Sequence, residues 1–253
     1  MKNKKRILCL SVTLIIALLC STAAFALTPN GVSVSSATAY STASGSTSIG
    51  SIGVNENLTI GSTSGSRTYV TYRTSGADKS GWVSTSAVQS TGYRWPVDCE
   101  NTTQIFNSSA GHLGMDMTSS ISDDNITMPY AGTIQAKGYD GATTGNGNWV
   151  VVKYNNSLYS LFAHLASAST LTTGTSYSKG TVIGTMGNTG NSTGKHLHFS
   201  FFNTYIANSR NGYTTSAGTV VSQSTNKIVM DYSGTQVSFY NPQYVIRNNG
   251  TTP

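Results

Sequence analysis

The residues of this chain best suited to chemistry are its four histidines, His112, His164, His196 and His198. A histidine taken alone is usually structural, but four of them confined to one part of a 253-residue chain favour a metal site or an acid–base site. Asp116, four residues after His112, adds a carboxylate to the set. Imidazole and carboxylate groups are zinc ligands, and a site with three protein ligands keeps the fourth position of the ion open. These residue types therefore predict a catalytic metal site rather than a closed structural one.

The spacing of these residues sets a condition on the backbone. His196 and His198 are two residues apart, so on a β-strand both side chains point to the same face. His112 and Asp116 would also share a face, but at about 3.3 Å per residue a straight strand separates them by roughly 13 Å. Ligands of one ion lie much closer together than that. The chain must therefore bend between them, and the two glycines of the segment Gly111–Gly114 can supply the bend.

Three motifs resemble those of the lysostaphin-like and LytM-like peptidoglycan endopeptidases. They are His112-x-x-x-Asp116, Phe162-Ala-His164-Leu165 and His196-x-His198, and the flanking segments Pro129–Ile134 and Lys179–Gly194 also match. The similarity covers roughly residues 95 to 202. By position, it implies that His112, Asp116 and His198 bind one zinc ion. It also implies that His164 and His196 stand over the open coordination position as catalytic residues.

Two other classes of hydrolase fit the sequence poorly. Zinc proteases with an H-E-x-x-H helix use a glutamate as base, but the glutamates here, Glu56 and Glu100, adjoin no histidine. The segment Gly190–Gly194 matches G-x-S-x-G, yet it runs into an alternating strand pattern, whereas a nucleophile elbow leads into a helix. Proton transfer is therefore assigned to His164 and His196, whose ordinary pKa near 6.5 suits both a base and an acid.

The resemblance implies hydrolysis of peptide bonds in the cross-links or stem peptides of bacterial peptidoglycan. The alternative is a non-catalytic wall-binding or amidase-activating protein, because some relatives have lost metal ligands and only bind. All five motif positions are present here, which favours the enzyme. The chain departs from the family pattern at Lys195, where proline is frequent, and at Ser200, where an acidic or amide residue is common. Neither position is a ligand.

The first 26 residues have the pattern of a secretory signal peptide. Basic residues occur between Lys2 and Arg6, an uncharged run extends from Ile7 to Leu19, and Ala24-Phe25-Ala26 forms a small-residue cleavage pattern. The uncharged run is shorter than the roughly 20 residues of a membrane-spanning helix. We therefore expect a secreted protein, extracellular or associated with the cell wall, without a stable membrane anchor. The sequence does not indicate an oligomeric state.

Charge and cysteine content narrow the partners further. Residues 1–26 hold four of the fifteen basic residues and none of the nine acidic ones, so the rest of the chain has a net charge of only +2. Such a chain lacks the basic surface that binding to nucleic acid requires. Cys9 and Cys20 would leave with the signal peptide, so Cys99 would remain alone, buried and without an intrachain disulfide.

The remaining chain is predicted to be all-β and to form two units. Residues 27–92 contain short β-type runs separated by polar turns, and Gly81-Trp82-Val83 resembles a step near the end of bacterial SH3-like wall-targeting domains. Within this unit the stretch Ser35–Ser51 could instead be a linker. Residues 93–253 lack a helical period and are predicted to form the antiparallel β-sheet of the peptidase, with an added hairpin region at about 203–236.

Overall fold

The computed structural model describes residues 27–75, 77–98, 100–107, 111–154, 158–206 and 218–253. This part of the chain is almost entirely antiparallel β-structure, so the all-β prediction is confirmed. Within it, no helix is long and apolar enough to cross a membrane. The predicted signal peptide and Cys99 lie outside the described residues.

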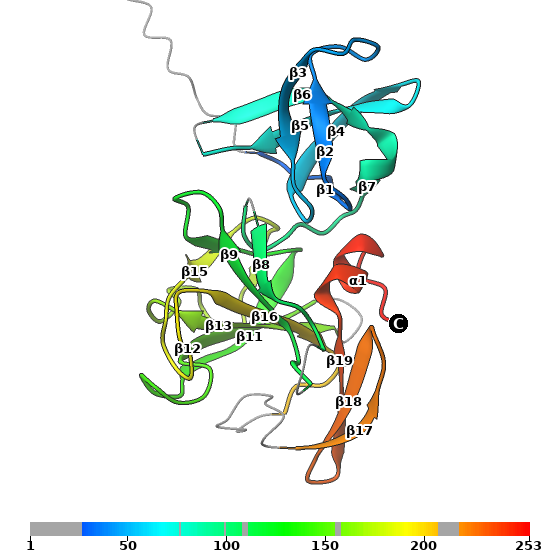
Figure 1. Cartoon of the computed structure of the whole chain (residues 1–253). Coiled ribbons are helices and arrows are strands. Elements are labelled where there is room, and N and C mark those ends of the chain that lie inside the picture. The colour runs from blue at the N-terminus through cyan, green and yellow to red at the C-terminus, as the bar shows by residue number, and fades with distance from the viewer. Residues whose placement is uncertain (1–26, 76, 99, 108–110, 155–157, 207–217) are drawn as a thin grey trace, which may run out of the picture.

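The N-terminal part forms a seven-stranded sheet in the order β3-β2-β6-β5-β4-β1-β7 (Figure 1). Its strands are β1 (Gly31–Ser33), β2 (Ala37–Tyr40), β3 (Ser48–Ile52), β4 (Asn57–Ser64), β5 (Arg67–Arg73), β6 (Asp78–Ser84) and β7 (Val88–Ser90), and a 3-10 turn (Thr85–Ala87) precedes β7. Alternate residues of β5 are buried, as expected for a strand with one face on a core. Because β2 and β3 pair with each other, the segment Ser35–Ser51 is part of the sheet and the linker alternative is wrong. The SH3-like assignment stays a prediction.

The second part forms a ten-stranded sheet in the order β14-β11-β12-β13-β16-β19-β18-β17, in which β9 also pairs with β16 and β8 with β9. Its strands are β8 (Glu100–Gln104), β9 (Met115–Ser119), β11 (Gly132–Tyr139), β12 (Asn148–Lys153), β13 (Tyr159–Leu165), β14 (Ser176–Tyr177), β16 (Leu197–Phe202), β17 (Thr219–Gln223), β18 (Lys227–Tyr232) and β19 (Thr235–Tyr240). A separate pair joins β10 (Asn125–Thr127) and β15 (Val182–Thr185). The predicted hairpin region corresponds to β17 and β18.

Central strands of the second sheet are almost fully apolar. In β13 every residue after Tyr159 is buried, and Phe162 packs against Phe199 of the neighbouring β16 with ring centroids 5.1 Å apart. Strands covered on both faces read as continuous apolar runs because neither face meets water. These two strands therefore form a rigid support for side chains at their ends.

A short helix, α1 (Pro242–Arg247), follows β19 and was not predicted. The Asn241 side chain caps it by accepting a hydrogen bond from the backbone N–H of Gln243 at 3.0 Å, and Pro242 occupies the first turn. Asparagine followed by proline is a helix-start signal. The helix has only six residues, too few for a helical period to be visible in the sequence.

Specific contacts join the two sheets. The buried amide of Asn57 donates to the carbonyl oxygens of Trp95 (3.1 Å) and Val97 (3.2 Å) and accepts from the Trp95 N–H (2.7 Å). Asp98 binds Arg94 at 2.5 Å and Arg73, from the N-terminal sheet, at 3.4 Å. The N-terminal sheet is therefore docked against the second sheet by buried polar contacts.

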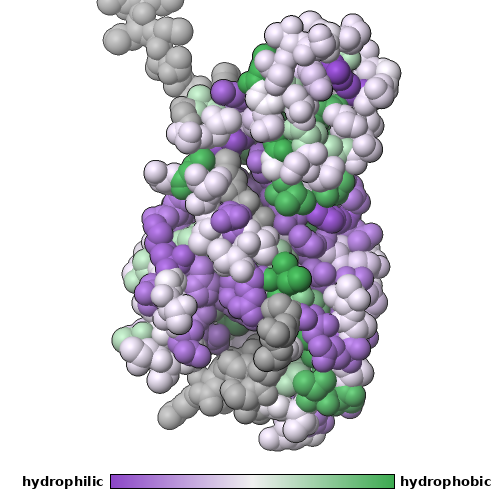
Figure 2. Space-filling view, viewed as in Figure 1, coloured by the Kyte–Doolittle hydropathy of each residue, from purple (hydrophilic) through white to green (hydrophobic). Residues whose placement is uncertain are grey.

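The two parts differ in surface character (Figure 2). The N-terminal sheet shows a mostly pale surface of intermediate hydropathy, whereas the larger part below it is mostly hydrophilic in this view. Serine and threonine dominate the N-terminal sequence, which accounts for its pale surface. The large apolar side chains exposed on the described N-terminal part are those of Ile49, Val54 and Tyr69.

Candidate metal centre and active site

Paired strands bring Asp116 and His198 together. Asp116 is the second residue of β9, His198 is the second residue of β16, and the two are directly opposite in the antiparallel register. Residues opposite each other in such a pair have their side chains on one face and close together. His112 precedes β9 and follows Gly111, which has a φ of +70°. The chain bends at Gly114, directly before β9, so the bend predicted between His112 and Asp116 is present.

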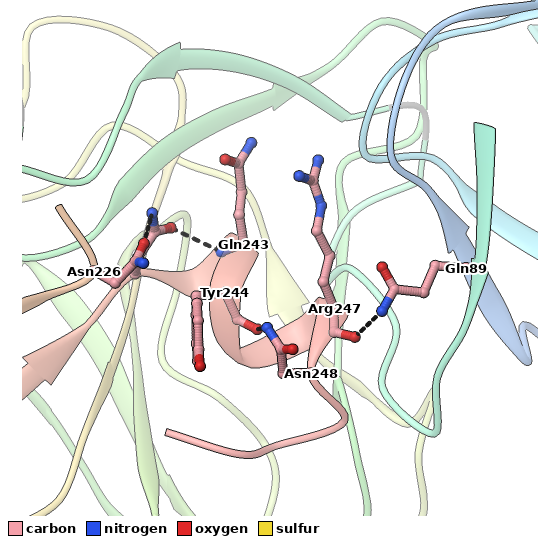
Figure 3. A pocket seen from close by; sticks show the side chains of 7 residues that line it. Gln89, Asn226, Gln243, Tyr244, Arg247 and Asn248 are labelled. Carbon is pink, nitrogen blue, oxygen red and sulfur yellow. Dashed lines mark hydrogen bonds between the residues drawn. The ribbon is translucent and has the colours of Figure 1, made fainter. Parts of the chain in front are cut away.

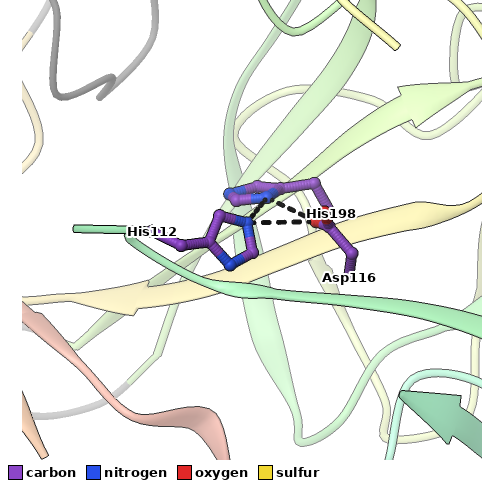
Figure 4. A group of neighbouring side chains, drawn as sticks. All are labelled: His112, Asp116 and His198. Atoms are coloured by element: carbon purple, nitrogen blue, oxygen red, sulfur yellow. Dashed lines mark hydrogen bonds and ion pairs between the residues drawn. The ribbon is translucent and has the colours of Figure 1, made fainter. Parts of the chain in front are cut away.

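The three predicted ligand atoms form a compact triangle (Figure 4). His112 Nε2 lies 3.1 Å from His198 Nδ1 and 3.2 Å from Asp116 Oδ1, and His198 Nδ1 lies 2.9 Å from Asp116 Oδ1. In a tetrahedral zinc site with bonds of 2.0–2.1 Å, neighbouring ligand atoms are about 3.3–3.4 Å apart. The observed edges are close to this value, so the three side chains fit one zinc ion with little movement. They are 14–16% exposed, which keeps the site open to solvent on one side.

The second nitrogen of His112 fixes the tautomer of its ring. His112 Nδ1 lies 3.1 Å from the carbonyl oxygen of Ile105, which can only accept a hydrogen bond. Nδ1 must therefore carry the proton, and in the neutral ring Nε2 presents a lone pair to Asp116 and His198. Metal-binding histidines typically anchor their other nitrogen in this way.

Electrostatics of the cluster also suit a cation. Burial alone would raise the pKa of Asp116, but hydrogen bonds from His112 and His198 and their nearby charge hold that pKa well below its usual range. Burial lowers the pKa of His198, although Asp116 opposes this effect. At neutral pH the site thus contains an ionised carboxylate and a neutral buried imidazole, the protonation states in which these groups bind metals.

His164 lies beside the cluster in an unusual backbone conformation. It is buried near the end of β13 with a φ of +63°, a region that non-glycine residues seldom occupy. Its Nδ1 lies 2.8 Å from the carbonyl oxygen of Thr189, and its backbone N–H donates to the carbonyl oxygen of Asn146 at 2.8 Å. Burial, followed by the charge of His198, lowers the pKa of His164 to about 4. The ring is therefore neutral at pH 7, with Nδ1 protonated and Nε2 free to accept a proton.

His196 is held in the same manner. Its Nδ1 lies 2.9 Å from the carbonyl oxygen of Gly194 and 3.2 Å from Ser192 Oγ, and its Nε2 lies 3.8 Å from Asp116 Oδ1. The His164 and His196 ring centroids are 4.7 Å apart. Both predicted catalytic histidines thus lie next to the predicted ligands, and each is anchored through Nδ1 to a backbone carbonyl.

Ser192, from the G-x-S-x-G match, has a different role from a catalytic nucleophile. Its hydroxyl lies 2.7 Å from Asn188 Oδ1 and 2.8 Å from the carbonyl oxygen of Gly194, within one turn. The chain then enters β16, a strand, so the strand–turn–helix context of a nucleophile elbow is missing. Ser192 instead supports the turn that carries His196.

Some supporting groups were missed in the sequence. The Ile105 and Thr189 contacts to the histidine rings use backbone carbonyls, which leave no side-chain signature. Gly114 is another such position, because a Cβ there would lie 2.8 Å from His198 Nε2 and 2.5 Å from the carbonyl oxygen of Phe199. The absence of a side chain at Gly114 thus leaves room for the His198 ring.

We expect Gly114→Ala to weaken zinc binding by about 10- to 100-fold, the range seen when groups that orient metal ligands are altered. The added methyl group would displace the His198 ring from the position that matches a zinc ion. Competitive titration with a chromogenic zinc chelator measures the change. Gly194→Ala is the matched control, because a Cβ at Gly194 meets nothing within 4 Å. Equal affinities in both variants would contradict the close-packing argument.

The convergent cluster of His112, Asp116 and His198 in this antiparallel β-domain could hold one metal ion. Residues 110–211 match the family model of Peptidase family M23. The matched region includes Asp116 and all four histidines.

Solved structures that match part of the chain include two peptidases and one M23 protein. The catalytic domain of lysostaphin from Staphylococcus simulans is 26% identical, over 47% of this chain and 82% of that one, with a TM-score of 0.34. A zinc-containing peptidase from Vibrio cholerae is 21% identical, over 53% of this chain, with a TM-score of 0.37, and this chain spans 43% of its length. The catalytic domain of a prophage-encoded M23 protein from Enterococcus faecalis is 22% identical, over 40% and 79% of the two chains, with a TM-score of 0.36.

Proposed function

We propose that this protein is a secreted zinc-dependent endopeptidase that hydrolyses peptide bonds in the cross-links or stem peptides of bacterial peptidoglycan. The observation that supports this most directly is the triangle of His112, Asp116 and His198, whose ligand atoms lie 2.9–3.2 Å apart with two further histidines beside it. A non-catalytic wall-binding or amidase-activating protein would not need such a complete set. The completeness of the site therefore favours the enzyme.

His112, Asp116 and His198 are the residues that would hold the metal. When bound, zinc supplies a Lewis acid that polarises a carbonyl and lowers the pKa of a coordinated water to near 7. Asp116 would contribute the negative charge of the site, and His112 and His198 would each offer an imidazole nitrogen to the metal. The ordered His112 tautomer, fixed by Ile105, keeps its lone pair directed to the centre of the site.

His164 and His196 handle protons in this proposal. Each has Nδ1 hydrogen-bonded to a backbone carbonyl, so Nε2 is the nitrogen that accepts a proton in the neutral ring. A ring that has taken a proton from water can stabilise negative charge on the substrate carbonyl oxygen or protonate the departing amine.

The proposal is tested by incubating the purified protein with isolated peptidoglycan and analysing the released fragments by mass spectrometry. We expect fragments with new amino ends, no release after treatment with a chelator, and restored release after zinc is added. Binding to the wall without any release would instead support the non-catalytic alternative. Release of sugar fragments with intact peptides would contradict peptide-bond cleavage.

We also propose that residues 27–92 attach the enzyme to wall polymers through an aromatic row on the N-terminal sheet. Tyr40 of β2 and Tyr69 of β5 are both paired in register with Trp82 of β6, so the three side chains lie side by side on one face. Tyr69 and Trp82 meet edge to face with centroids 5.3 Å apart, and the Arg67 guanidinium lies 3.7 Å above the Tyr40 ring. Rows of partly exposed rings offer flat apolar surface with polar edges for a polymer.

Trp82→Ala is expected to weaken binding to isolated walls by about tenfold, because removal of a partly exposed tryptophan from the centre of the row costs on the order of 1–2 kcal/mol of binding free energy. Cleavage of small soluble peptides should be unchanged, since tethering affects only the local concentration of enzyme on the polymer. Co-sedimentation with walls measures the effect. Tyr139→Ala, which removes a 57% exposed ring from the second sheet, is the control. Equal sedimentation of both variants would contradict the targeting role.

Point substitution is a sharper test here than deletion of residues 27–92. Val32 of the N-terminal sheet belongs to the same apolar core as Trp95 and Val97, and Asn57 hydrogen-bonds to the backbone of both. Deletion would therefore expose core surface of the second sheet and leave buried polar groups unpaired. A loss of activity after deletion would confuse wall targeting with stability.

A further inference from the structure

A polar pocket of about 300 Å³ lies where helix α1 meets the end of the N-terminal sheet (Figure 3). Amide side chains dominate its lining, among them Gln89, Asn226 and Gln243, together with the phenol of Tyr244 and the guanidinium of Arg247. The lining contains no acidic residue and none of the candidate metal ligands or catalytic histidines. It is therefore a second site, separate from the candidate metal centre.

Arg247 is a half-buried cation that forms no ion pair with any residue that the structure describes. Among the described residues its guanidinium has one hydrogen-bond partner, with Nη2 donating to Asn55 Oδ1 at 3.1 Å, while its Nε is buried and unpaired. Arg73 and Arg94, in contrast, each form an ion pair with Asp98. Burial lowers the pKa of Arg247, which reflects the cost of holding its charge away from water. A cation in this situation favours an anionic ligand that would complete its hydrogen bonds.

The guanidinium is fixed in place by both parts of the molecule. Asn55, which accepts a hydrogen bond from Arg247, is fully buried in the turn between β3 and β4 and has a φ of +62°, a conformation that asparagine tolerates better than most residues. Gln89, at the end of the N-terminal sheet, donates through Nε2 to the backbone carbonyl oxygen of Arg247. The position of Arg247 is therefore set before any ligand binds, which lowers the entropic cost of binding.

Neighbouring groups offer both donors and acceptors. Gln243 precedes Arg247 by one helical turn, and their side chains project from α1 in the same direction (Figure 3). In the described part of the chain the Gln243 amide has no hydrogen-bond partner. Asn226 Oδ1 accepts a hydrogen bond from Asn241 at 3.3 Å, so the Nδ2 donor of Asn226 is available to a ligand. Gln89 donates through Nε2 to Arg247, so the Oε1 acceptor of Gln89 is available as well. A ligand that matches this set must itself both donate and accept, as peptide groups do.

We propose that this pocket binds the free terminal carboxylate of a short wall peptide. Arg247 pairs with the carboxylate, and Gln243 and Asn226 bond to the adjoining peptide group. The guanidinium fork fits a planar carboxylate with two parallel hydrogen bonds. A phosphodiester would also satisfy the cation, but it only accepts hydrogen bonds and would leave the amide oxygens unmatched. The choice of a wall peptide rests on the proposed function, whereas the carboxylate site itself does not.

The test is isothermal titration of the full protein after zinc has been removed, so that neither hydrolysis nor a metal ion contributes to binding. The probes are acetyl-D-alanyl-D-alanine, the same dipeptide with a terminal carboxamide, and a glycerol phosphodiester. We expect the free acid to bind and the carboxamide to bind about tenfold or more weakly, because a charge-assisted pair is lost. Arg247→Gln should cause a similar loss with the free acid. Lys79→Gln, which removes an exposed cation from β6, should cause none.

Gln243→Ala is a second test that should not disturb folding, because the Gln243 amide is partly exposed and has no hydrogen-bond partner among the described residues. We expect it to weaken binding of the free acid by about threefold or more, with unchanged thermal unfolding. Equal binding of the acid and the carboxamide overturns the proposal, as does full affinity in Arg247→Gln. Tighter binding of the phosphodiester than of the peptide acid also overturns it. If Arg247→Gln does not fold, the two peptides and Gln243→Ala decide the matter. These affinities do not depend on wall cleavage, so failure of the proposed function would leave them unchanged.

Discussion

Asp116→Ala and His198→Ala are each expected to lose bound zinc on gel filtration, with a fall in affinity of at least about a hundredfold. Each variant removes one of the three converging ligand atoms. The resulting loss of zinc affinity should exceed the 10- to 100-fold loss that is typical when a group supporting a ligand is altered. The loss should be larger for Asp116, because it removes the negative charge that balances the cation. Elemental analysis of the purified variants measures zinc directly.

Asp124→Ala is the matched control for this experiment. Asp124 is an exposed carboxylate that pairs with Lys195 at 2.7 Å, outside the metal cluster. Its removal should leave the zinc content unchanged. Circular dichroism of all three variants shows whether the fold is kept. Full zinc occupancy in both ligand variants would mean that the ion binds elsewhere, and the assignment of the site would be wrong.

Much of this site follows from residue spacing. The interval between His196 and His198 predicted one shared strand face. In the structure β16 carries His198, and His196 directly precedes this strand in an isolated bridge to Gly187. The need for a bend between His112 and Asp116 also followed from the length of a strand, and the chain bends at Gly114, directly before β9. Local geometry was predictable here because it depends on a few consecutive residues.

Long-range register was not predictable in the same way. Asp116 lies opposite His198 because β9 pairs with β16, a contact between residues 82 positions apart in the chain. No local pattern specifies that pairing, and only the resemblance of the motifs indicated it. The positive φ of His164 was equally hidden, because it depends on the hydrogen bond from its N–H to Asn146.

The junction between the sheets shows a different limit of sequence reasoning. A boundary near residue 92 was predicted from composition, and the strands of the two sheets do fall on either side of it, between β7 and β8. Asn57 and Arg73 nevertheless reach across to the segment that follows. The composition of the sequence indicates where one run of strands ends. It does not indicate which polar side chains will be buried between the N-terminal sheet and the second sheet.

His164→Ala and His196→Ala are expected to keep zinc but to lose about a hundredfold or more in peptide-bond cleavage. Neither side chain belongs to the three-atom triangle, whereas both rings lie beside it, with His196 Nε2 3.8 Å from Asp116 Oδ1. Groups that move protons in the transition state typically contribute 10²- to 10⁴-fold in rate. The loss should therefore appear in the turnover number while zinc content stays at the level of the unaltered protein.

Two further variants separate chemistry from folding at these positions. The positive φ of His164 makes alanine strained there, so His164→Asn, which tolerates that conformation, should fold as well as the unaltered protein and still lose activity. Ser192→Ala removes the hydroxyl 3.2 Å from His196 Nδ1 but leaves the Gly194 carbonyl contact, so it should reduce turnover by less than tenfold. If His196→Ala lost its metal while His198→Ala kept it, the roles of the two residues would be reversed. Removal of a ring that only fills space beside the ligands would not change turnover a hundredfold. If neither histidine substitution slowed cleavage, His164 and His196 would have such a space-filling role, and other groups would have to transfer the protons.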